Sequence, residues 1–103
     1  MEKIIIPVFG NRISPRLEYA KSFQLITIEN NKIIAKESVM ILANNILERI
    51  NMLINLKPDV VICNGLSELY REELVKNHIR IIPWINGNVE TIIKKYLNKT
   101  LNK

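Results

Sequence analysis

The segment from residue 59 to residue 84, DVVICNGLSELYREELVKNHIRIIPW, decides the fold because its hydrophobic pattern predicts a strand, a helix and a second strand. Residues 59–63 and 79–84 are short apolar runs rich in β-branched side chains, and Ser67 can cap the helix between them. The side chains of this helix expected to point inward are Leu66, Leu69, Tyr70 and Leu74. Two strands joined through a helix lie parallel with a right-handed crossover, so the segment predicts an α/β fold.

The first forty residues predict three further strands. Residues 3–9 form a nearly continuous apolar run, which is typical of a strand buried on both faces. Residues 23–29 and 33–39 alternate apolar and polar side chains on either side of Asn30-Asn31. Because asparagine tolerates positive φ, this pair predicts a hairpin turn between the two strands.

Two more helices follow from helical spacing of apolar residues. Asn45 and Glu48 resemble a capping pair at the start of a helix that should end near Lys57-Pro58. A final helix follows Gly87 and Asn88, with an apolar stripe made of Val89, Ile92, Ile93, Tyr96 and Leu97. The sequence therefore predicts three helices in all.

Together these elements predict one α/β domain over residues 1–103, with a five-stranded mixed sheet covered by helices. Counting the strands along the chain, the most economical spatial order is 3-2-1-4-5. In that order the second and third strands lie on one side of the first strand, and the chain then returns to its other side through the fourth. This creates a topological switch point between the first and fourth strands. Ligands of open α/β sheets bind beyond the carboxyl ends of the strands at such a switch point.

Composition narrows the class of protein. Apolar residues make up 48% of the 103 residues, enough for a core without disulfides, and the one cysteine suits a reducing compartment such as the cytoplasm. We expect neither a secretion signal nor a membrane span.

The net charge of +5 favours anionic partners. Much of the surplus is near the end of the chain, where a solvated helix face explains it better than nucleic-acid binding does. Those residues are Lys94, Lys95, Lys99 and Lys103.

Three loops are expected to converge at the switch point, namely residues 10–16, 64–67 and 86–88. The first carries two guanidiniums, an amide and a hydroxyl, which can hold an anion through charge-assisted hydrogen bonds. The second places backbone N–H groups at a helix start, which also favours an anion. The alternative is that both are ordinary solvated loops. The candidate ligand-binding residues are Asn11, Arg12, Ser14, Arg16, Asn64, Gly65 and Ser67.

Three stretches carry a resemblance to a known family: IIIPVFGNRISPR at residues 4–16, VICNGLS at 61–67 and IIPWING at 81–87. Together they resemble the dinitrogenase iron-molybdenum cofactor biosynthesis domain family. The resemblance implies a ribonuclease-H-like fold and the binding, carrying or delivery of the iron-molybdenum cofactor or a related iron–sulfur cluster. It also implies nitrogenase-maturation or iron–sulfur carrier proteins as partners. Family members often have Gly-Gly-Ile after the cysteine, where this chain has Asn64-Gly65-Leu66.

The single cysteine leaves two interpretations open. Cys63 follows a strand beside the basic loop, so its thiolate could ligate an iron atom of a cluster, although a buried structural cysteine is the commoner case. Because clusters usually take several cysteine ligands, a second subunit, as in a homodimer, or a cofactor carrying its own ligands would complete the set. His78, the only histidine, is expected at a helix end, away from the loops.

We do not expect an enzyme. A ribonuclease-H-like nuclease needs clustered carboxylates for two metal ions, but Asp59 is the only aspartate and is predicted at the wrong end of its strand. Glu18 is the only acid close to the first loop, and the sole histidine is predicted to lie far from Cys63 and Ser14, which argues against a nucleophile–histidine pair. A scaffold or regulatory interaction module that binds no cofactor is the alternative function.

Overall fold

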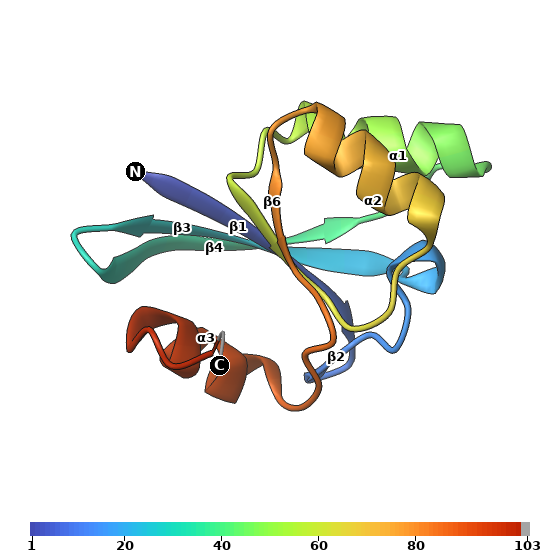
Figure 1. Ribbon diagram of the computed structural model, residues 1–103. Helices are drawn as coiled ribbons and strands as arrows, with labels where there is room; N and C mark the ends of the chain where they lie inside the picture. The colour runs from blue at the N-terminus through green and yellow to red at the C-terminus, as the bar shows by residue number, and fades with distance from the viewer. Residues whose placement is uncertain (102–103) are drawn as a thin grey trace.

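The computed structural model shows an α/β domain in which helices cover both faces of a mixed sheet (Figure 1). It describes residues 1–101, so Lys103 of the predicted lysine face lies outside the described residues. The strands are β1 (Glu2–Phe9), β2 (Arg12–Ile13), β3 (Ser22–Glu29), β4 (Lys32–Met40), β5 (Val60–Ile62) and β6 (Arg80–Ile82). The helices are α1 (Ile46–Asn55), α2 (Glu68–Lys76) and α3 (Val89–Leu97), with a 3-10 turn η1 (Leu17–Tyr19). The predicted α/β class with three helices and a mixed sheet is confirmed.

The sheet has the order β4-β3-β1-β5-β6, with the two-residue strand β2 attached to β1. β1 pairs antiparallel with β3 and parallel with β5, and β6 continues the parallel half. Strand direction therefore changes at β1, and the carboxyl ends of β1, β5 and β6 lie at one edge. β2 was not predicted, because a two-residue strand leaves no periodic signal in the sequence.

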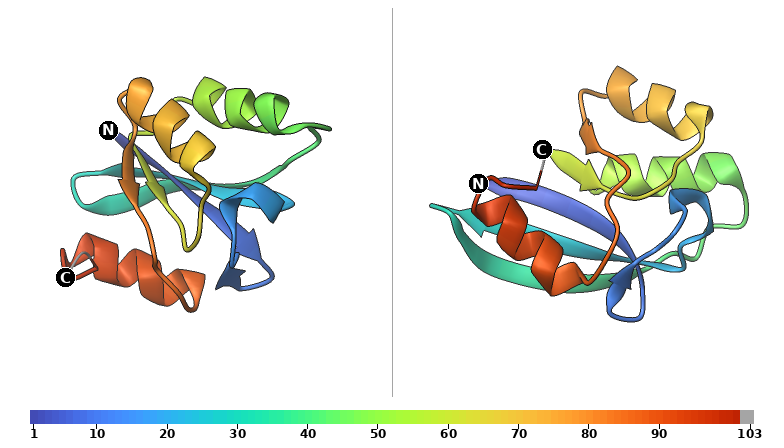
Figure 2. Two further views of the ribbon diagram at one scale, coloured as in Figure 1. Left: turned by 45° about the vertical axis from the view of Figure 1, so that its right-hand side comes forward. Right: turned by 60° about the horizontal axis from the view of Figure 1, so that its bottom comes forward.

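The two faces of the sheet carry separate cores. Helices α1 and α2 lie on one face and α3 on the other, as Figure 1 and both views of Figure 2 show. Ile5 packs in the core beneath α1 and α2, whereas its neighbours Ile4 and Ile6 pack in the core beneath α3. This alternation follows from the two-residue period of a strand, and it explains why β1 is apolar almost throughout.

The predicted helix signals largely agree with the structure. The Asn45 side chain accepts the Glu48 N–H at 3.0 Å and donates to the Glu48 carboxylate at 3.1 Å, which confirms the capping pair. His78 follows α2 with φ +62°, where the N–H of Ile79 reaches the Leu74 carbonyl at 3.0 Å. It thus closes the helix in a left-handed conformation, as expected of a helix-end residue. The prediction for Leu69 is wrong: it is exposed, because it lies on the solvent side of α2.

The hairpin between β3 and β4 turns at Asn30 and Asn31, whose φ values are +54° and +65°. Both residues have positive φ, as a tight two-residue turn requires. β4 is the edge strand of the sheet, and most of its side chains are exposed. No helix among residues 1–101 is long and apolar enough to cross a bilayer.

Candidate functional site

Backbone hydrogen bonds hold the three loops together beyond the carboxyl ends of the parallel strands. The Ile13 N–H donates to the Gly87 carbonyl at 3.0 Å, and the Gly65 N–H donates to the Pro15 carbonyl at 2.9 Å. The Trp84 N–H reaches the Asn64 carbonyl at 3.0 Å. The loop after β1 therefore contacts the loops after both β5 and β6, and we call this region the loop edge.

The first loop divides the predicted site residues into two groups. After a tight turn at Gly10, whose φ is +64°, β2 folds back on β1 and Arg12 pairs with Asn88. The Asn11 carbonyl accepts the Val89 N–H at 2.9 Å, so this end of the loop adjoins the start of α3. Further along the loop, Arg16 pairs with Gly65 beside the start of α2. The group near α3 contains Asn11 and Arg12, and the group near α2 contains Arg16, Asn64, Gly65 and Ser67.

The two arginines differ in their electrostatic surroundings. Arg16 donates two hydrogen bonds to the Glu18 carboxylate, and this contact raises the pKa of the guanidinium. Within residues 1–101 the second oxygen of that carboxylate, Glu18 Oε1, is buried without a hydrogen-bond partner. Arg12 is exposed and makes no side-chain hydrogen bond or ion pair to any described residue. Because Glu18 partly neutralises Arg16 and would repel an incoming anion, Arg12 is the more available cation.

Ser14 has a structural role in the loop. Its side chain is buried, with 4% of the residue exposed, and its hydroxyl donates to the Arg16 carbonyl at 3.0 Å. Its N–H donates to the Pro7 carbonyl at 2.9 Å. The hydroxyl therefore fixes the course of the loop, and in this conformation it does not face a ligand from solvent.

Gly65 lets the first loop pass close to the turn after β5. A Cβ atom at this position would lie 3.2 Å from the Pro15 carbonyl oxygen and 3.2 Å from the Arg16 guanidinium. The space that a side chain would occupy is therefore taken by the first loop. Ser67 next to this turn caps α2, since its hydroxyl accepts the Tyr70 N–H at 3.4 Å.

Cys63 lies in the core beneath α1 and α2. It has no exposed surface and packs in the same cluster as Leu17, Leu66 and Tyr70. Burial raises the pKa of its thiol to about 12. At neutral pH the group is therefore a protonated thiol, whereas ligation of iron requires the thiolate.

A cavity of about 210 Å³ adjoins the Arg12 side of the loop edge. Gly10 and Asn11 line it together with Gln24 of β3, Lys36 of β4 and Asn88 before α3. Sequence reasoning missed Gln24 and Lys36 because both lie within predicted strands, where a polar side chain indicates only the solvent-facing side. Their distance from the loop in sequence conceals the fact that antiparallel pairing brings them beside it.

Trp84 is a third residue that sequence reasoning did not single out for the site. It follows β6 with φ +63°, a conformation uncommon for an aromatic residue, and 66% of it is exposed. Phe9 at the end of β1 and Tyr19 at the end of η1, on either side of the first loop, are also exposed. A large aromatic side chain at the last position of the predicted strand of residues 79–84 was the available signal. The loop edge thus combines basic groups with exposed aromatic surface.

Metal-binding potential is limited by the donors present. Within residues 1–101, no three His, Cys, Asp or Glu side chains come together in a group that could hold a metal ion. Asp59 accepts the Lys3 N–H at 2.8 Å, close to the start of β1 and therefore at the opposite end of the sheet from the loop edge. The loop edge offers positive charge and N–H donors instead.

These features define a small α/β domain with a mixed sheet and a basic loop edge beyond its parallel strands. The chain belongs to the dinitrogenase iron-molybdenum cofactor family, whose sequence model matches residues 2–99. The family resemblance noted in the sequence is therefore confirmed over nearly the whole chain. No curated protein sequence matches it significantly.

Three solved structures share the fold at low sequence identity. A protein designated PH0822 is 16% identical, with a TM-score of 0.89 over 94% of this chain and 89% of that one. A Methanocaldococcus jannaschii protein provisionally named a dinitrogenase is 19% identical, with a TM-score of 0.80 over 95% and 89% of the two chains. A Thermotoga protein provisionally named NifB is 17% identical, with a TM-score of 0.80 over 100% and 93%. At these identities the likeness establishes the fold alone.

Proposed function

We propose that this protein is a small, cytoplasmic, non-catalytic binding or carrier protein for an anionic metal cluster, either the iron-molybdenum cofactor or a related iron–sulfur cluster. Family membership over residues 2–99 supports this cargo. The proposal includes a ribonuclease-H-like fold, supported by the order β4-β3-β1-β5-β6 and its mixture of strand directions. Nitrogenase-maturation or iron–sulfur carrier proteins would supply or receive the cluster.

The observation that carries the proposal is the exposed guanidinium of Arg12 at the loop edge. Its neighbour Asn11 lines a small cavity together with Lys36 and Glu90. The cavity lining itself holds one cation, Lys36, and one anion, Glu90, so the uncommitted Arg12 supplies the excess positive charge in this region. Charge-assisted hydrogen bonds are stronger than neutral ones, and an anionic cluster would gain them from Arg12 on arrival. Asn11 and Asn88 add amide groups at the same place.

The mode of binding proposed is capture of an intact anion by charge and hydrogen bonds. Several protein–iron bonds are not supported, because residues 1–101 hold no group of three candidate ligands and Cys63 is a buried thiol. For Cys63 to ligate iron, the side chains that bury it, such as Leu17, Leu66 and Tyr70, would have to move. A second subunit or the cluster itself would have to provide the other ligands. Arg12 makes the first contact in this scheme.

Anaerobic titration of the protein with isolated iron-molybdenum cofactor, and separately with a reconstituted iron–sulfur cluster, tests the proposal. Loss of one charge-assisted hydrogen bond costs about 1.5–3 kcal/mol, so Arg12→Ala should weaken binding roughly ten- to a hundredfold. Arg16→Ala should have a smaller effect, because Glu18 already pairs with Arg16. Lys94→Ala is the matched control, since it removes one exposed positive charge from α3 away from the loop edge.

Cys63→Ser separates the two roles of the cysteine. A core thiol should lose stability on replacement and leave the visible spectrum of the bound cluster unchanged, whereas an iron ligand should change or abolish that spectrum. Equal affinities in wild type, Arg12→Ala, Arg16→Ala and Lys94→Ala would contradict the loop edge as the site.

The alternative function is a scaffold or regulatory module that binds another protein and no cofactor. Exposed aromatic residues at the loop edge, including Phe9 and Trp84, are the observation in its favour. Large exposed apolar side chains gathered on one surface are typical of protein interaction sites. This function would replace the first if neither cluster binds to any of the variants while Trp84→Ala abolishes association with a partner.

A further inference from the structure

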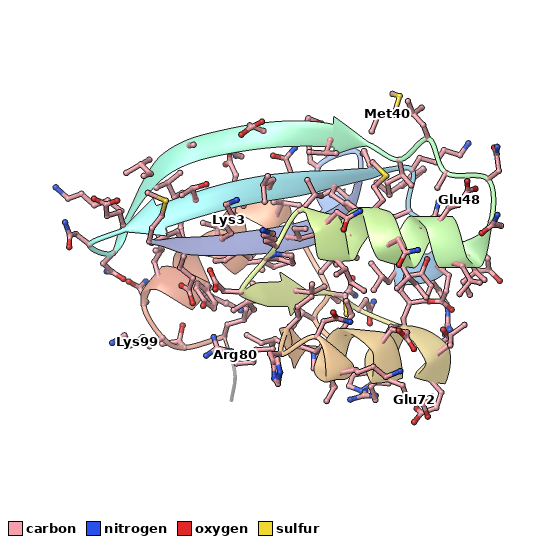
Figure 3. The ribbon with its side chains drawn as sticks, turned by 90° about the horizontal axis from the view of Figure 1, so that it is seen from above. Lys3, Met40, Glu48, Glu72, Arg80 and Lys99 are labelled. Carbon is pink, nitrogen blue, oxygen red and sulfur yellow. The ribbon has the colours of Figure 1, made fainter. Side chains whose placement is uncertain are left out.

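We propose that a second cavity, at the opposite end of the sheet from the loop edge, binds a small organic carboxylate with an apolar body. The cavity has a volume of about 430 Å³, within the usual range for small-molecule sites of about 300–1,000 Å³. It lies between the start of β1, the turn after β3, the parallel strand β6 and the end of α3. Figure 3 shows Arg80 and Lys99 at this end of the sheet, away from Met40 at the end of β4.

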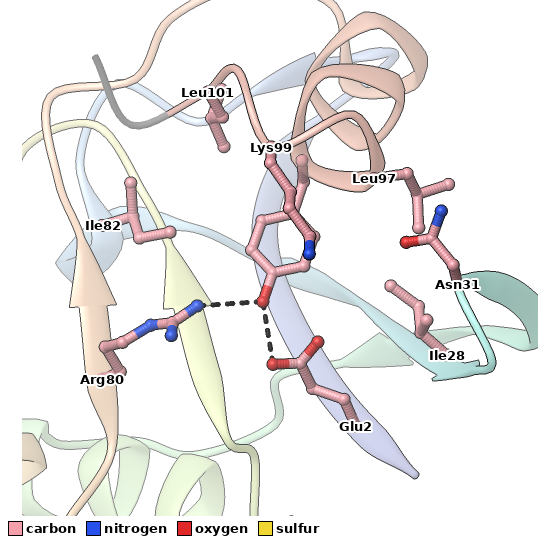
Figure 4. Close-up of a pocket in the computed structure, with 9 residues that line it drawn as sticks. Glu2, Ile28, Asn31, Arg80, Ile82, Leu97, Lys99 and Leu101 are labelled. Carbon is pink, nitrogen blue, oxygen red and sulfur yellow. Dashed lines mark hydrogen bonds between the residues drawn. The ribbon is translucent and has the colours of Figure 1, made fainter.

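Apolar side chains form the body of this cavity. Ile28 and Ile82 are buried residues of the core beneath α3, and Leu97 and Leu101 pack against that core. Figure 4 shows these four side chains around the central space, with polar groups reaching in between them. A ligand with a hydrocarbon or aromatic body would remove this surface from water and be stabilised by doing so.

The hydroxyl of Tyr96 forms hydrogen bonds with two of the charged side chains that line the cavity. The Tyr96 hydroxyl donates to the Glu2 carboxylate at 2.8 Å and accepts a hydrogen bond from Arg80 Nη2 at 3.0 Å (Figure 4). Burial and the neighbouring Glu2 raise the pKa of Tyr96 to about 12, so the hydroxyl stays protonated and keeps donating. Glu2 thus has a hydrogen-bond partner, and Arg80 is held at the wall of the cavity.

The balance of charge determines the kind of ligand. Arg80 and Lys99 give the cavity two cations against the single anion Glu2. Within residues 1–101, Lys99 makes no side-chain hydrogen bond or ion pair, and Arg80 makes only its bond to Tyr96. One carboxylate would neutralise the excess charge and match the fork of a guanidinium. A phosphate dianion would bring surplus negative charge toward Glu2, and an amine would meet two like charges.

The experiment is an NMR titration of the full chain with octanoate, with octan-1-ol and octylamine as matched uncharged and cationic probes. Octanoate should shift the methyl signals of Ile28 and Ile82 and bind at least tenfold more tightly than either of the other probes. Arg80→Met and Lys99→Met should each weaken octanoate binding about tenfold or more, the cost of one charge-assisted hydrogen bond. Lys94→Met, with the same loss of charge on exposed α3 surface, should retain the wild-type affinity.

Several outcomes would overturn the proposal: no shift of Ile28 or Ile82 at millimolar octanoate, equal binding of octanol, or unchanged affinity in Lys99→Met. Lys99→Met keeps the test decisive if Arg80→Met unfolds, because the Lys99 side chain makes no hydrogen bond or ion pair within residues 1–101, and its backbone bond to the Tyr96 carbonyl remains in the variant. Arg12→Ala should bind octanoate as wild type does. A failure here therefore leaves the cluster-binding proposal standing, and the reverse is equally true.

Discussion

At the scale of single residues, side chains of one type have different roles according to their immediate neighbours. Arg12 is exposed and available, whereas Arg16, four residues later, is engaged by Glu18 and fills the space beside Gly65. Burial also limits two other candidates, since both Ser14, predicted to bind a ligand, and Cys63, for which a buried structural role was one of two interpretations, have little or no exposed surface. The ligand binding proposed at this edge would therefore depend first on which polar atoms the loop leaves without a partner.

Burial of Cys63 predicts a distinct dependence of stability on pH. The folded thiol has a pKa of about 12 against an ordinary value of 9.0, so above pH 9 only the unfolded chain loses this proton. The free energy of unfolding should therefore fall as pH rises from about 9 toward 12, and the contribution of Cys63 to this fall should reach about 1.4 kcal/mol by pH 10. Urea unfolding of wild type and Cys63→Ala between pH 8 and 10 measures it.

The difference between the two proteins is the informative quantity, because every ionisable group other than Cys63 is present in both. Wild type should approach the stability of Cys63→Ala as pH rises and should exceed it most below pH 9. Parallel curves over this range would show that the thiol ionises as readily in the folded protein as in the unfolded one. Such a thiol would be available as a ligand.

At the scale of secondary-structure elements, short-range signals determine where helices and hairpins begin and end. Asn45 starts α1 through a reciprocal bond with Glu48, and His78 closes α2 in a left-handed conformation. Asn30 and Asn31 turn the chain between β3 and β4. Each signal acts within four residues, which is why it can be read from sequence.

Replacing the cap of α1 should have a measurable cost. Asn45→Ala removes the side-chain acceptor for the Glu48 N–H and should lower the free energy of unfolding by about 1 kcal/mol. Asn51→Ala, an exposed position within α1, is the control and should leave stability unchanged or slightly increased, since alanine favours helix. Thermal unfolding followed by circular dichroism compares them. An equal loss in both variants would mean that the cap contributes nothing specific.

At the scale of the whole molecule, the sheet joins two cores that share one central strand. Ile5 belongs to the core beneath α1 and α2, and Ile6 to the core beneath α3. Neither layer can bury its apolar face without β1. We therefore expect the domain to unfold as one cooperative unit.

Truncation of either residue tests this cooperativity. Ile5→Val and Ile6→Val should each lower stability by about 0.5–1.5 kcal/mol, the usual cost of removing one buried methylene. In both variants, NMR signals from α1 and from α3 should disappear at the same urea concentration. Earlier loss of the α3 signals in Ile6→Val alone would show that the two layers unfold separately.

Several features of the fold and site could be read from the sequence because they rest on local rules. Periodicity identified β1, β3, β4, β5, β6 and the three helices, and connectivity placed three loops at one edge. Cap and turn residues fixed most element ends. The motif residues around Arg12 and Gly65 also revealed the family, which the family match over residues 2–99 confirms.

Only the tertiary structure decided which groups meet. It brought Gln24 and Lys36 beside Asn11, set Arg12 apart from Arg16, buried Ser14, and joined Glu2 to Tyr96 across 94 residues of chain. Propensity, periodicity and capping act over a few neighbouring residues, whereas these contacts depend on strand pairing and on how α3 packs across the sheet. The sequence by itself thus determined the elements and their order, and packing determined which polar side chains are available to bind a ligand.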